Sequence, residues 1–300
     1  TNLGICRDMV DKTIDTLVPD IYKLLEEGLP TTDGNICEGL AMKDFLSEMK
    51  DAVLNAVSDS DKGSRGNALR LSQIGYPDRK IYYNSQTELP DEKLGGSTLM
   101  KFLYGHMLEA LLIFLAKTAG HKVEGLQKEV DIGGVSGHQD AMIDNVVVDV
   151  KSASTFSFNK FKSGSIAEND AFGYIGQLSA YADANNTEEC GWLVVDKSTG
   201  ELAWCPLHPM EMINAEERVH SIKSMLLSDT IPPRCYDDVP DGMSGNRVLA
   251  IGCVYCNHKN TCWADSNGGM GLRRFQYSNG PKHFTEVWKE PRVAEITTDG

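Results

Sequence analysis

Basic residues are scarce in this chain of 300 residues. Lysine and arginine together number 29, against 43 aspartates and glutamates, so the formal net charge is −14. Because like charges repel, this imbalance argues against a protein that binds nucleic acid passively through its overall charge. It does not exclude an enzyme that acts on a phosphate backbone, since bound divalent cations supply positive charge locally.

Long apolar runs are also missing. The longest, MLEALLIFLA (107–116), is short for a bilayer span and contains Glu109. The first residues, TNLGICRDMV, lead directly into charged, helix-like sequence and show no signal peptide. We therefore expect a cytoplasmic protein with no membrane partner. Its eight cysteines are then better read as free thiols or metal ligands than as a disulfide framework.

Residues 1–68 are predicted to form a helical segment of their own. The stretch 8–28 has a helical pattern that is broken or restarted at Pro19 and ends at Gly28. A second stretch, 45–57, carries an apolar residue at every fourth position, and a polar connector follows it. This segment is expected to oligomerise, to bind a recombination or replication partner, or to cover a site.

The middle of the chain, residues 69–265, is predicted to be one α/β domain. A helix that begins at Ser97 or Thr98 is followed by three strands, a helix and two further strands. The third strand, NVVVDVKSAS, is rich in valine on both faces and is expected to lie at the centre of the sheet. A helix over 209–227 then leads into a cysteine-rich tail, whose last part, 266–300, is expected to pack on this domain.

Two aspartates and a lysine interrupt the apolar strands. Asp140 and Asp149 lie on either side of a turn predicted at DN (144–145), so the two carboxylates can converge. Alternation along a strand places Asp149 and Lys151 on one face. Such a group can hold Mg²⁺ or Mn²⁺, which prefer oxygen ligands, with the lysine near a metal-bound water. A buried structural ion pair is the alternative.

Two helices carry further polar pairs at helical spacing. His106 and Glu109 are three residues apart on the helix before the strands, and Gln177 and Tyr181 are four apart on the helix after them. Residues at these spacings share one helical face, so each pair can point toward the same site.

In this order the motifs resemble the PD-(D/E)XK nuclease superfamily, in its RecB-like, CRISPR-associated exonuclease branch. The chain has GHMLE for G-H-x-x-E, GHQD for G-x-x-D, DVK for (D/E)-x-K and QLSAY for Q-x-x-x-Y. The resemblance covers about residues 70–265 and implies a restriction-endonuclease-like core, in which a mixed central sheet is flanked by helices. Stand-alone chains of this kind also occur in phages.

The resemblance also implies roles for these residues. Aspartate stands at 149, where many relatives carry glutamate, although either carboxylate belongs to the pattern. Lys151 would assist the attacking water, and the motif glutamine and tyrosine would position that water or the scissile strand. The implied metal ligands are His106, Asp140, Asp149 and the carbonyl of Val150, and the implied catalytic group is Asp140, Asp149, Lys151, Gln177, Tyr181 and Glu109.

The tail contains CVYCNHKNTCW, with cysteines at 253, 256 and 262. Thiolates spaced this tightly favour zinc or an iron–sulfur cluster. In the relatives that this chain resembles, the same triplet holds a [4Fe–4S] cluster that ties the ends of the domain together. The predicted cluster ligands are Cys253, Cys256, Cys262 and Asp78.

The fourth ligand departs from the pattern of the relatives, which carry a cysteine ahead of the G-H-x-x-E helix. Here Asp78 stands closest to that place, and Cys37 or His258 is the next choice, the latter suiting a Cys₃His zinc site. An ordinary solvated aspartate is the alternative. Cys190 and Cys205 are expected in the core, and Cys235 has no evident role.

Directly after the lysine strand, SASTFSFNKFKSG interleaves aromatic and basic residues. Aromatic rings stack on unpaired bases and lysines neutralise phosphates. A core-packing loop with solvated lysines is the alternative. The expected DNA-binding residues are Phe156, Phe158, Lys160, Lys162 and Arg79.

Together these features predict a metal-dependent exonuclease that acts on single-stranded or end-containing DNA in recombination, repair or replication. An endonuclease would use the same site. A non-catalytic iron–sulfur or zinc scaffold or sensor that binds DNA or protein is the alternative from another class.

Overall fold

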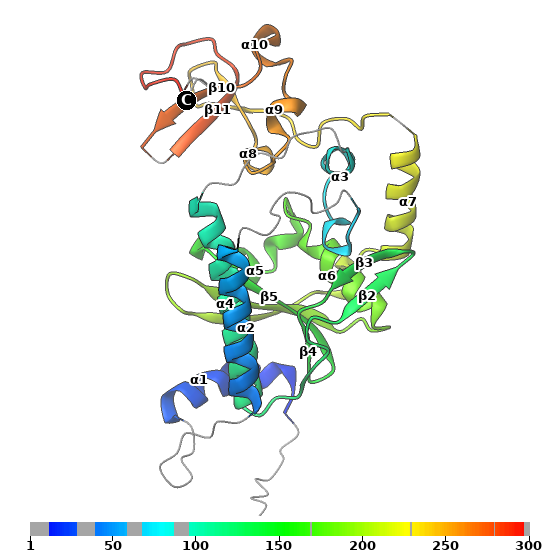
Figure 1. Ribbon diagram of the computed structural model, residues 1–300. Coiled ribbons are helices and arrows are strands. Elements are labelled where there is room, and N and C mark those ends of the chain that lie inside the picture. Colours follow the sequence, from blue (N-terminus) through cyan, green and yellow to red (C-terminus); the bar gives the residue numbers. More distant parts are fainter. Residues whose placement is uncertain are drawn as a thin grey trace, which may run out of the picture.

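The computed structural model describes residues 12–28, 40–58, 68–86, 96–168, 170–228, 230–278 and 280–296. A mixed central sheet is flanked by helices, and a smaller lobe formed by C-terminal residues lies at one end of the molecule (Figure 1). The predicted α/β class with a mixed, helix-flanked sheet is thereby confirmed.

The central sheet has the strand order β1-β4-β5-β6-β7. The middle strand, β5, pairs in parallel with β6, and the other neighbours pair antiparallel. Residues 146–150 of β5 are all buried, as expected for a valine-rich strand covered on both faces. The strands are β1 Val123–Glu124, β4 Ala141–Ile143, β5 Val146–Ala153, β6 Cys190–Asp196 and β7 Leu202–Pro206.

The predicted turn between β4 and β5 is present. Asp144 and Asn145 have φ angles of 51° and 69°, the left-handed conformation that a two-residue hairpin loop of this kind requires. This turn fixes the register in which Ala141 faces Val148. A separate hairpin of β2 (Glu129–Ile132) and β3 (Val135–His138) lies beside the sheet.

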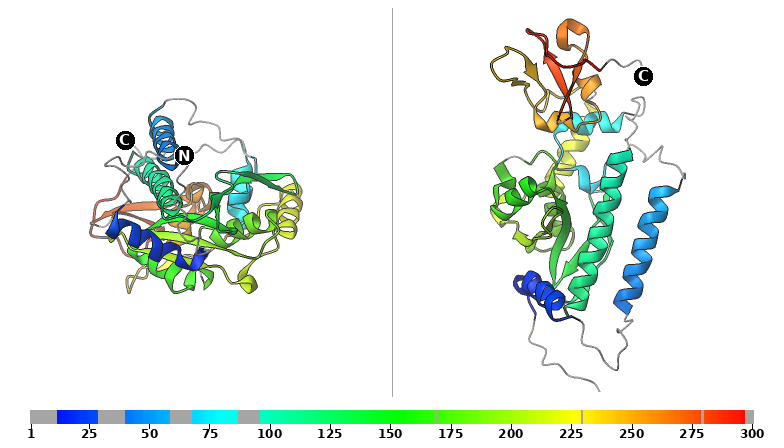
Figure 2. Two further views of the ribbon diagram at one scale, coloured as in Figure 1. Left: turned by 90° about the horizontal axis from the view of Figure 1, so that it is seen from below. Right: turned by 90° about the vertical axis from the view of Figure 1, so that its left-hand side faces the viewer.

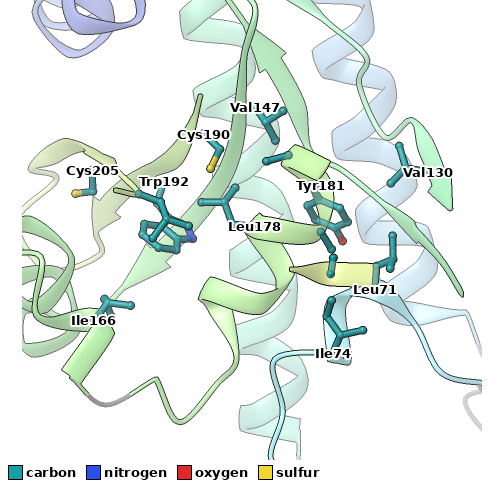
Figure 3. Packing of buried hydrophobic residues seen from close by; sticks show 14 of the residues in the cluster. Leu71, Ile74, Val130, Val147, Ile166, Leu178, Tyr181, Cys190, Trp192 and Cys205 are labelled. Atoms are coloured by element: carbon teal, nitrogen blue, oxygen red, sulfur yellow. The ribbon is translucent and has the colours of Figure 1, made fainter. Parts of the chain in front are cut away.

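Helices cover both faces of the central sheet and form two cores. On one face, α5, α6 and α7 pack with the β2–β3 hairpin around Leu178 and Tyr181 (Figure 3). On the other face, α1 and α4 pack against β4, β5 and β6. The helices are α1 Leu17–Glu27, α2 Leu40–Val57, α3 Asp78–Ser85, α4 Gly96–Thr118, α5 Thr155–Lys162, α6 Tyr174–Ala184 and α7 Ala215–Leu227, with short 3-10 turns at Ile14–Thr16, Leu71–Gln73, Ser165–Glu168 and Pro209–Glu211.

Helix α1 belongs to the central body, contrary to the expectation that residues 1–68 stand apart. Leu17 and Ile21 are completely buried in the second core. The hydroxyl of Tyr22 accepts a hydrogen bond from the backbone N–H of Leu202 in β7 at 2.7 Å. Pro19 does not break the helix, because it lies in the first turn, where its missing N–H leaves no helical bond unmade.

Helix α2 lies alongside α4 (Figure 2). Phe45 stacks on Phe114 of α4 with ring centroids 5.0 Å apart, and Lys117 pairs with Asp44 at 3.2 Å. By length and composition, the stretch Leu99–Thr118 of α4 could cross a membrane, so the apolar helix is longer than the ten-residue run suggested. In this fold α4 packs on α1, α2 and β5, although only 22% of that stretch is buried.

The C-terminal lobe combines a small antiparallel sheet with short helices. Its sheet has the order β10-β11-β9-β8 and packs around Val248, Phe275 and Phe284. The lobe therefore begins before residue 240, and the predicted boundary at 265 falls inside it, because β9 pairs with β11. Its elements are β8 Val239–Pro240, β9 Arg247–Val248, α8 Ile251–Val254, α9 Lys259–Cys262, α10 Ser266–Gly269, β10 Arg273–Tyr277 and β11 Gly280–Glu286.

Candidate active site

Asp140 and Asp149 are brought together by the β4–β5 hairpin. Asp140 directly precedes β4, and the pairing of Ala141 with Val148 sets it beside the middle of β5. One carboxylate oxygen of Asp140, Oδ2, accepts a hydrogen bond from the backbone N–H of Val150 at 2.8 Å. The side chain of Asp149 is buried, with 2% of its surface exposed. The predicted convergence of the two strands is thus seen in the backbone.

Lys151 lies on the same face of β5 as Asp149. Its ammonium nitrogen is 2.9 Å from Asp149 Oδ1 and 2.7 Å from Oδ2. It also donates to Oε1 of Gln177 at 3.4 Å and lies 5.1 Å from the centre of the Tyr174 ring. The lysine is therefore held between the central strand and helix α6.

Helix α6 presents the glutamine and tyrosine of the fourth motif. Nε2 of Gln177 donates to the hydroxyl of Tyr181 at 3.5 Å, which agrees with their expected position on one face. The carboxylate of Asp170 accepts bonds from the backbone N–H groups of Tyr174 and Ile175, at 2.9 and 2.8 Å. This acidic group holds the start of α6 and was not predicted, although an aspartate ahead of an apolar helix is a recognisable start signal.

Glu109 approaches the site from α4, but His106 does not. Oε1 of Glu109 accepts a hydrogen bond from Nε2 of Gln127 at 2.7 Å. The side chain of His106 is 69% exposed, and its Nδ1 lies 4.0 Å from Oε2 of Glu109. The structure gives His106 no contact with either aspartate, so it lies at the rim and is not among the grouped carboxylates.

The charges of the carboxylates and of Lys151 shift one another's pKa values. Burial and the charges of Asp149 and Glu109 raise the pKa of Asp140 well above its usual value. Burial and the charge of Asp149 raise the pKa of Glu109 to about 7. The pKa of Asp149 is also raised by burial, which Lys151 only partly offsets. Burial opposes the charge on Lys151, yet the two aspartates raise its pKa, so it stays charged.

These groups have the chemistry of a hard-cation site. Three carboxyl groups share one ammonium, and the oxygens match the ligands that Mg²⁺ and Mn²⁺ prefer. No three His, Cys, Asp or Glu side chains among the described residues could hold a metal ion as they are placed. The predicted ligand set has only two carboxylates, those of Asp140 and Asp149, and takes its third oxygen from the backbone carbonyl of Val150. A search for three side chains would therefore not include it.

The aromatic and basic stretch after β5 is divided between surface and core. Phe156 is 73% exposed, and the ammonium of Lys160 lies 5.0 Å from the centre of its ring. Phe158 is only 1% exposed and belongs to the core of the first face, so its predicted contact with DNA is wrong. Lys162 is paired with Glu201 at 2.6 Å.

The three tail cysteines line a single pocket between the C-terminal lobe and helix α3. Asp78 does not line it: its carboxylate is paired with the guanidinium of Arg218 in α7 at 2.8 Å, which corrects the expected fourth ligand. Nε2 of His258 is hydrogen-bonded to Oδ1 of Asn84 at 2.6 Å. Cys37, the other alternative, lies outside the described residues.

Arg79, which was predicted to bind DNA, also lines the cysteine pocket. Its guanidinium donates to the carbonyl of Pro232 at 2.7 Å and to the hydroxyl of Tyr83 at 3.2 Å. Cys190 and Cys205 are buried in the first core, as expected (Figure 3).

Comparison with known proteins gives little support beyond the structure itself. No protein-family model and no curated protein matches the chain. The solved protein SSO0001 is 14% identical, with 74% of this chain and 96% of that chain covered and a TM-score of 0.41. An alkaline exonuclease from Laribacter hongkongensis is also 14% identical, with 54% and 89% covered and a TM-score of 0.38. Likenesses this distant carry no argument about activity.

Proposed function

We propose that this protein is a metal-dependent deoxyribonuclease that hydrolyses phosphodiester bonds at the Asp140–Asp149–Lys151 site. One observation carries the proposal: the buried carboxyl group of Asp149 and the half-buried carboxyl group of Asp140 meet a charged lysine at the central strand, where burial and repulsion raise the pKa of both acids. Desolvated acids are costly unless a cation compensates them. A single ammonium leaves the group short of positive charge, and a divalent ion would supply it.

The side chains would divide the work as follows. Asp140, Asp149 and the Val150 carbonyl would hold Mg²⁺ or Mn²⁺, which when bound polarises a phosphoryl oxygen and acidifies water. Lys151 would hydrogen-bond the attacking water and keep it on the side of the phosphorus opposite the leaving oxygen. Gln177, in contact with both Lys151 and Tyr181, would hold the ammonium in that position.

The surface beside the site favours DNA with unpaired bases. Phe156 exposes its ring on α5, which begins directly after β5, and Lys160 lies close to that ring. A base stacked on Phe156 would place its phosphate near this lysine. We therefore propose an exonuclease for single strands or strand ends, acting in the cytoplasm in recombination, repair or replication.

The test is hydrolysis of end-labelled DNA by the wild-type protein and by Asp149→Asn. We expect the wild type to cut with Mg²⁺ or Mn²⁺ and to stop with a chelator, and the variant to be inactive while folded. Glu124→Gln is a matched control, because Glu124 pairs with Lys122 at the surface and should leave the rate unchanged. Cleavage of a linear but not a closed circular substrate indicates an exonuclease, and cleavage of both an endonuclease.

A second candidate is a non-catalytic scaffold or sensor that binds DNA or protein. The exposed His106 favours it, because this side chain stands apart from the carboxylates with which it would share an ion. Hydrolysis that depends on both the added ion and Lys151 would exclude this candidate. Wild-type protein that binds DNA but leaves it intact with either ion would support it and contradict the nuclease.

A further inference from the structure

The cysteine pocket contains a fourth thiol that the tail motif does not include. Cys235 follows Pro232, Pro233 and Arg234 in the segment between α7 and β8, and it lines the same pocket as the three motif cysteines. Asp78, by contrast, forms an ion pair with Arg218 and does not line the pocket. The four thiols have the sequence spacing C-x17-C-x2-C-x5-C.

We propose that Cys235 is the fourth ligand of an iron–sulfur cluster held by Cys253, Cys256 and Cys262. The cluster would fasten the 230–236 segment to the short helices α8 and α9. This inference concerns the C-terminal lobe and does not depend on whether the carboxylate site cuts DNA.

Backbone N–H groups favour the thiolate form of two of these cysteines. Burial raises the pKa of the Cys235 thiol, and the backbone N–H groups of Lys80 and Arg79, at the start of α3, partly oppose that rise; the N–H of His258 opposes it in the same way at Cys256. Hydrogen bonds from backbone N–H groups to ligand sulfur stabilise the thiolate form and tune a bound cluster. A cysteine that served only as packing would not need such donors.

Positive charge also gathers around the four thiols. Arg79, Lys80, Arg234 and Lys259 all line the pocket. Burial lowers the pKa of Lys80, while Cys256 and Cys235 oppose that change, so both thiols lie within its electrostatic reach. Four thiolates around a metal centre carry a net negative charge, which these cations would offset. In a chain with a net charge of −14, four cations at one pocket require an explanation.

The spacing of the thiols favours a cluster over a single zinc ion. No three cysteines of the described chain could hold one ion as they are placed, although all four line one pocket. A single zinc needs every sulfur at about 2.3 Å from one point. A cluster spreads its ligands over several iron atoms and accepts thiols that lie further apart.

Assembly needs ferrous iron, ferric iron and sulfide from outside the protein, so that no iron atom has to change its oxidation state. Each of the four thiols releases its proton to solvent, and its sulfur then forms a bond to one iron atom. Burial raises the pKa of the Cys253 thiol to about 11, so that proton leaves only as the metal binds.

The test is anaerobic reconstitution of the full chain with ferrous and ferric iron and sulfide, in parallel with zinc. We expect bound iron and sulfide, visible iron–sulfur absorption and a reduced-state paramagnetic signal in the wild type. Cys235→Ser should lose most of the bound iron or change the signal, whereas Cys205→Ser and Asp78→Asn should keep both. Cys205 is a matched control because it is buried in the other core.

Thiol protection gives a second readout that needs no variant. In the loaded wild-type protein, alkylation followed by peptide mass spectrometry should find Cys235 protected together with the three motif cysteines, and all four modified once the cluster is removed. Full iron content with an unchanged paramagnetic signal in Cys235→Ser, alkylation of Cys235 in the loaded protein, loss of the cluster in Asp78→Asn, or binding of zinc alone would each overturn the proposal. None of these readouts depends on DNA hydrolysis.

Discussion

At the scale of single residues, the site is defined by an excess of acidic groups. Asp140, Asp149 and Glu109 lie within electrostatic reach of one another, and Lys151 is the cation that they share. Burial and the repulsion between these carboxylates raise their pKa values, so the fold disfavours their ionised form relative to water. A divalent cation bound between these groups would remove that opposition.

Titration of Glu109 should make the metal-free protein less stable as the pH rises. Its pKa is about 7 in the fold, against 4.5 for an ordinary glutamate, so the folded state binds its proton more tightly. The resulting stabilisation is complete below pH 4.5 and is lost as the pH passes through about 7. Asp140 and Asp149 act in the same direction. In urea unfolding with a chelator, the free energy of unfolding of Glu109→Gln should fall less between pH 4.5 and 7 than that of the wild type. If both proteins lost the same free energy over this pH range, the assignment would be contradicted.

Two neighbouring phenylalanines on α5 should behave differently. Phe158→Ala opens a cavity in the core and should cost about 3–5 kcal/mol in denaturant unfolding. Phe156→Ala should change stability by less than about 0.5 kcal/mol, but should weaken binding of single-stranded DNA by about 1–3 kcal/mol in fluorescence anisotropy. Unchanged affinity in Phe156→Ala would show that this ring does not contact the polymer.

At the scale of elements, helix α6 is positioned by close backbone packing. Gly176 lies directly against Gly75, in the segment that leads to α3, and a Cβ added to Gly176 would lie 2.4 Å from the Gly75 Cα. No side chain fits between them. This contact sets the height of α6 over the sheet and therefore the position of Gln177 beside Lys151.

Gly176→Ala should therefore destabilise the fold by about 1–3 kcal/mol, because two backbones would have to move apart. Gly96→Ala, where no atom lies within 4 Å of the added carbon, is the matched control and should be neutral. Thermal or urea unfolding of both variants measures the difference. Equal stability of the two would mean that α6 can shift without cost.

Elements whose signal is local could be predicted from the sequence. The valine-rich strand β5, the turn at 144–145 and the pairing of Gln177 with Tyr181 follow from alternation, turn chemistry and helical spacing. The resemblance to a known motif order supplied the rest of the candidate site. It also suggested His106, which the fold leaves at the surface.

Partnerships between distant segments could not be predicted in this way. Arg218 forms an ion pair with Asp78, which lies 140 residues earlier in the chain. Cys235 lines the same pocket as the tail cysteines, although it lies in a loop that carries no recognisable motif. Phe156 and Phe158 carry the same side chain, and only the helix that places one inward and the other outward separates their roles. Tertiary packing decides which residues become partners and which side chains are buried, and no local pattern in a single sequence indicates it.

At the scale of the whole molecule, the central sheet is covered on both faces and the N-terminal helix is part of that cover. Leu17 and Ile21 of α1 are buried against the sheet, and His121 lies between Asp20 of α1 and Asp144, at 3.2 and 2.6 Å. The first helix is thus fastened to the turn that sets the register of β5.

Leu17→Ala should consequently cost about 2–5 kcal/mol, as for a large side chain removed from a core. Leu25 is on the same helix but 59% exposed, so Leu25→Ala should change stability by less than about 0.5 kcal/mol. Urea unfolding of the full chain compares the two. A negligible effect of Leu17→Ala would restore the expectation of an independent N-terminal segment.

The most direct measurement of the central claim is anomalous X-ray diffraction from crystals of the wild-type protein soaked in manganese. The account predicts a manganese peak bound by the carboxylates of Asp140 and Asp149 and by the carbonyl of Val150, and no such peak in Asp149→Asn. Crystals saturated with manganese that show no ion between these groups, while Lys151 remains the only partner of Asp149, would contradict it.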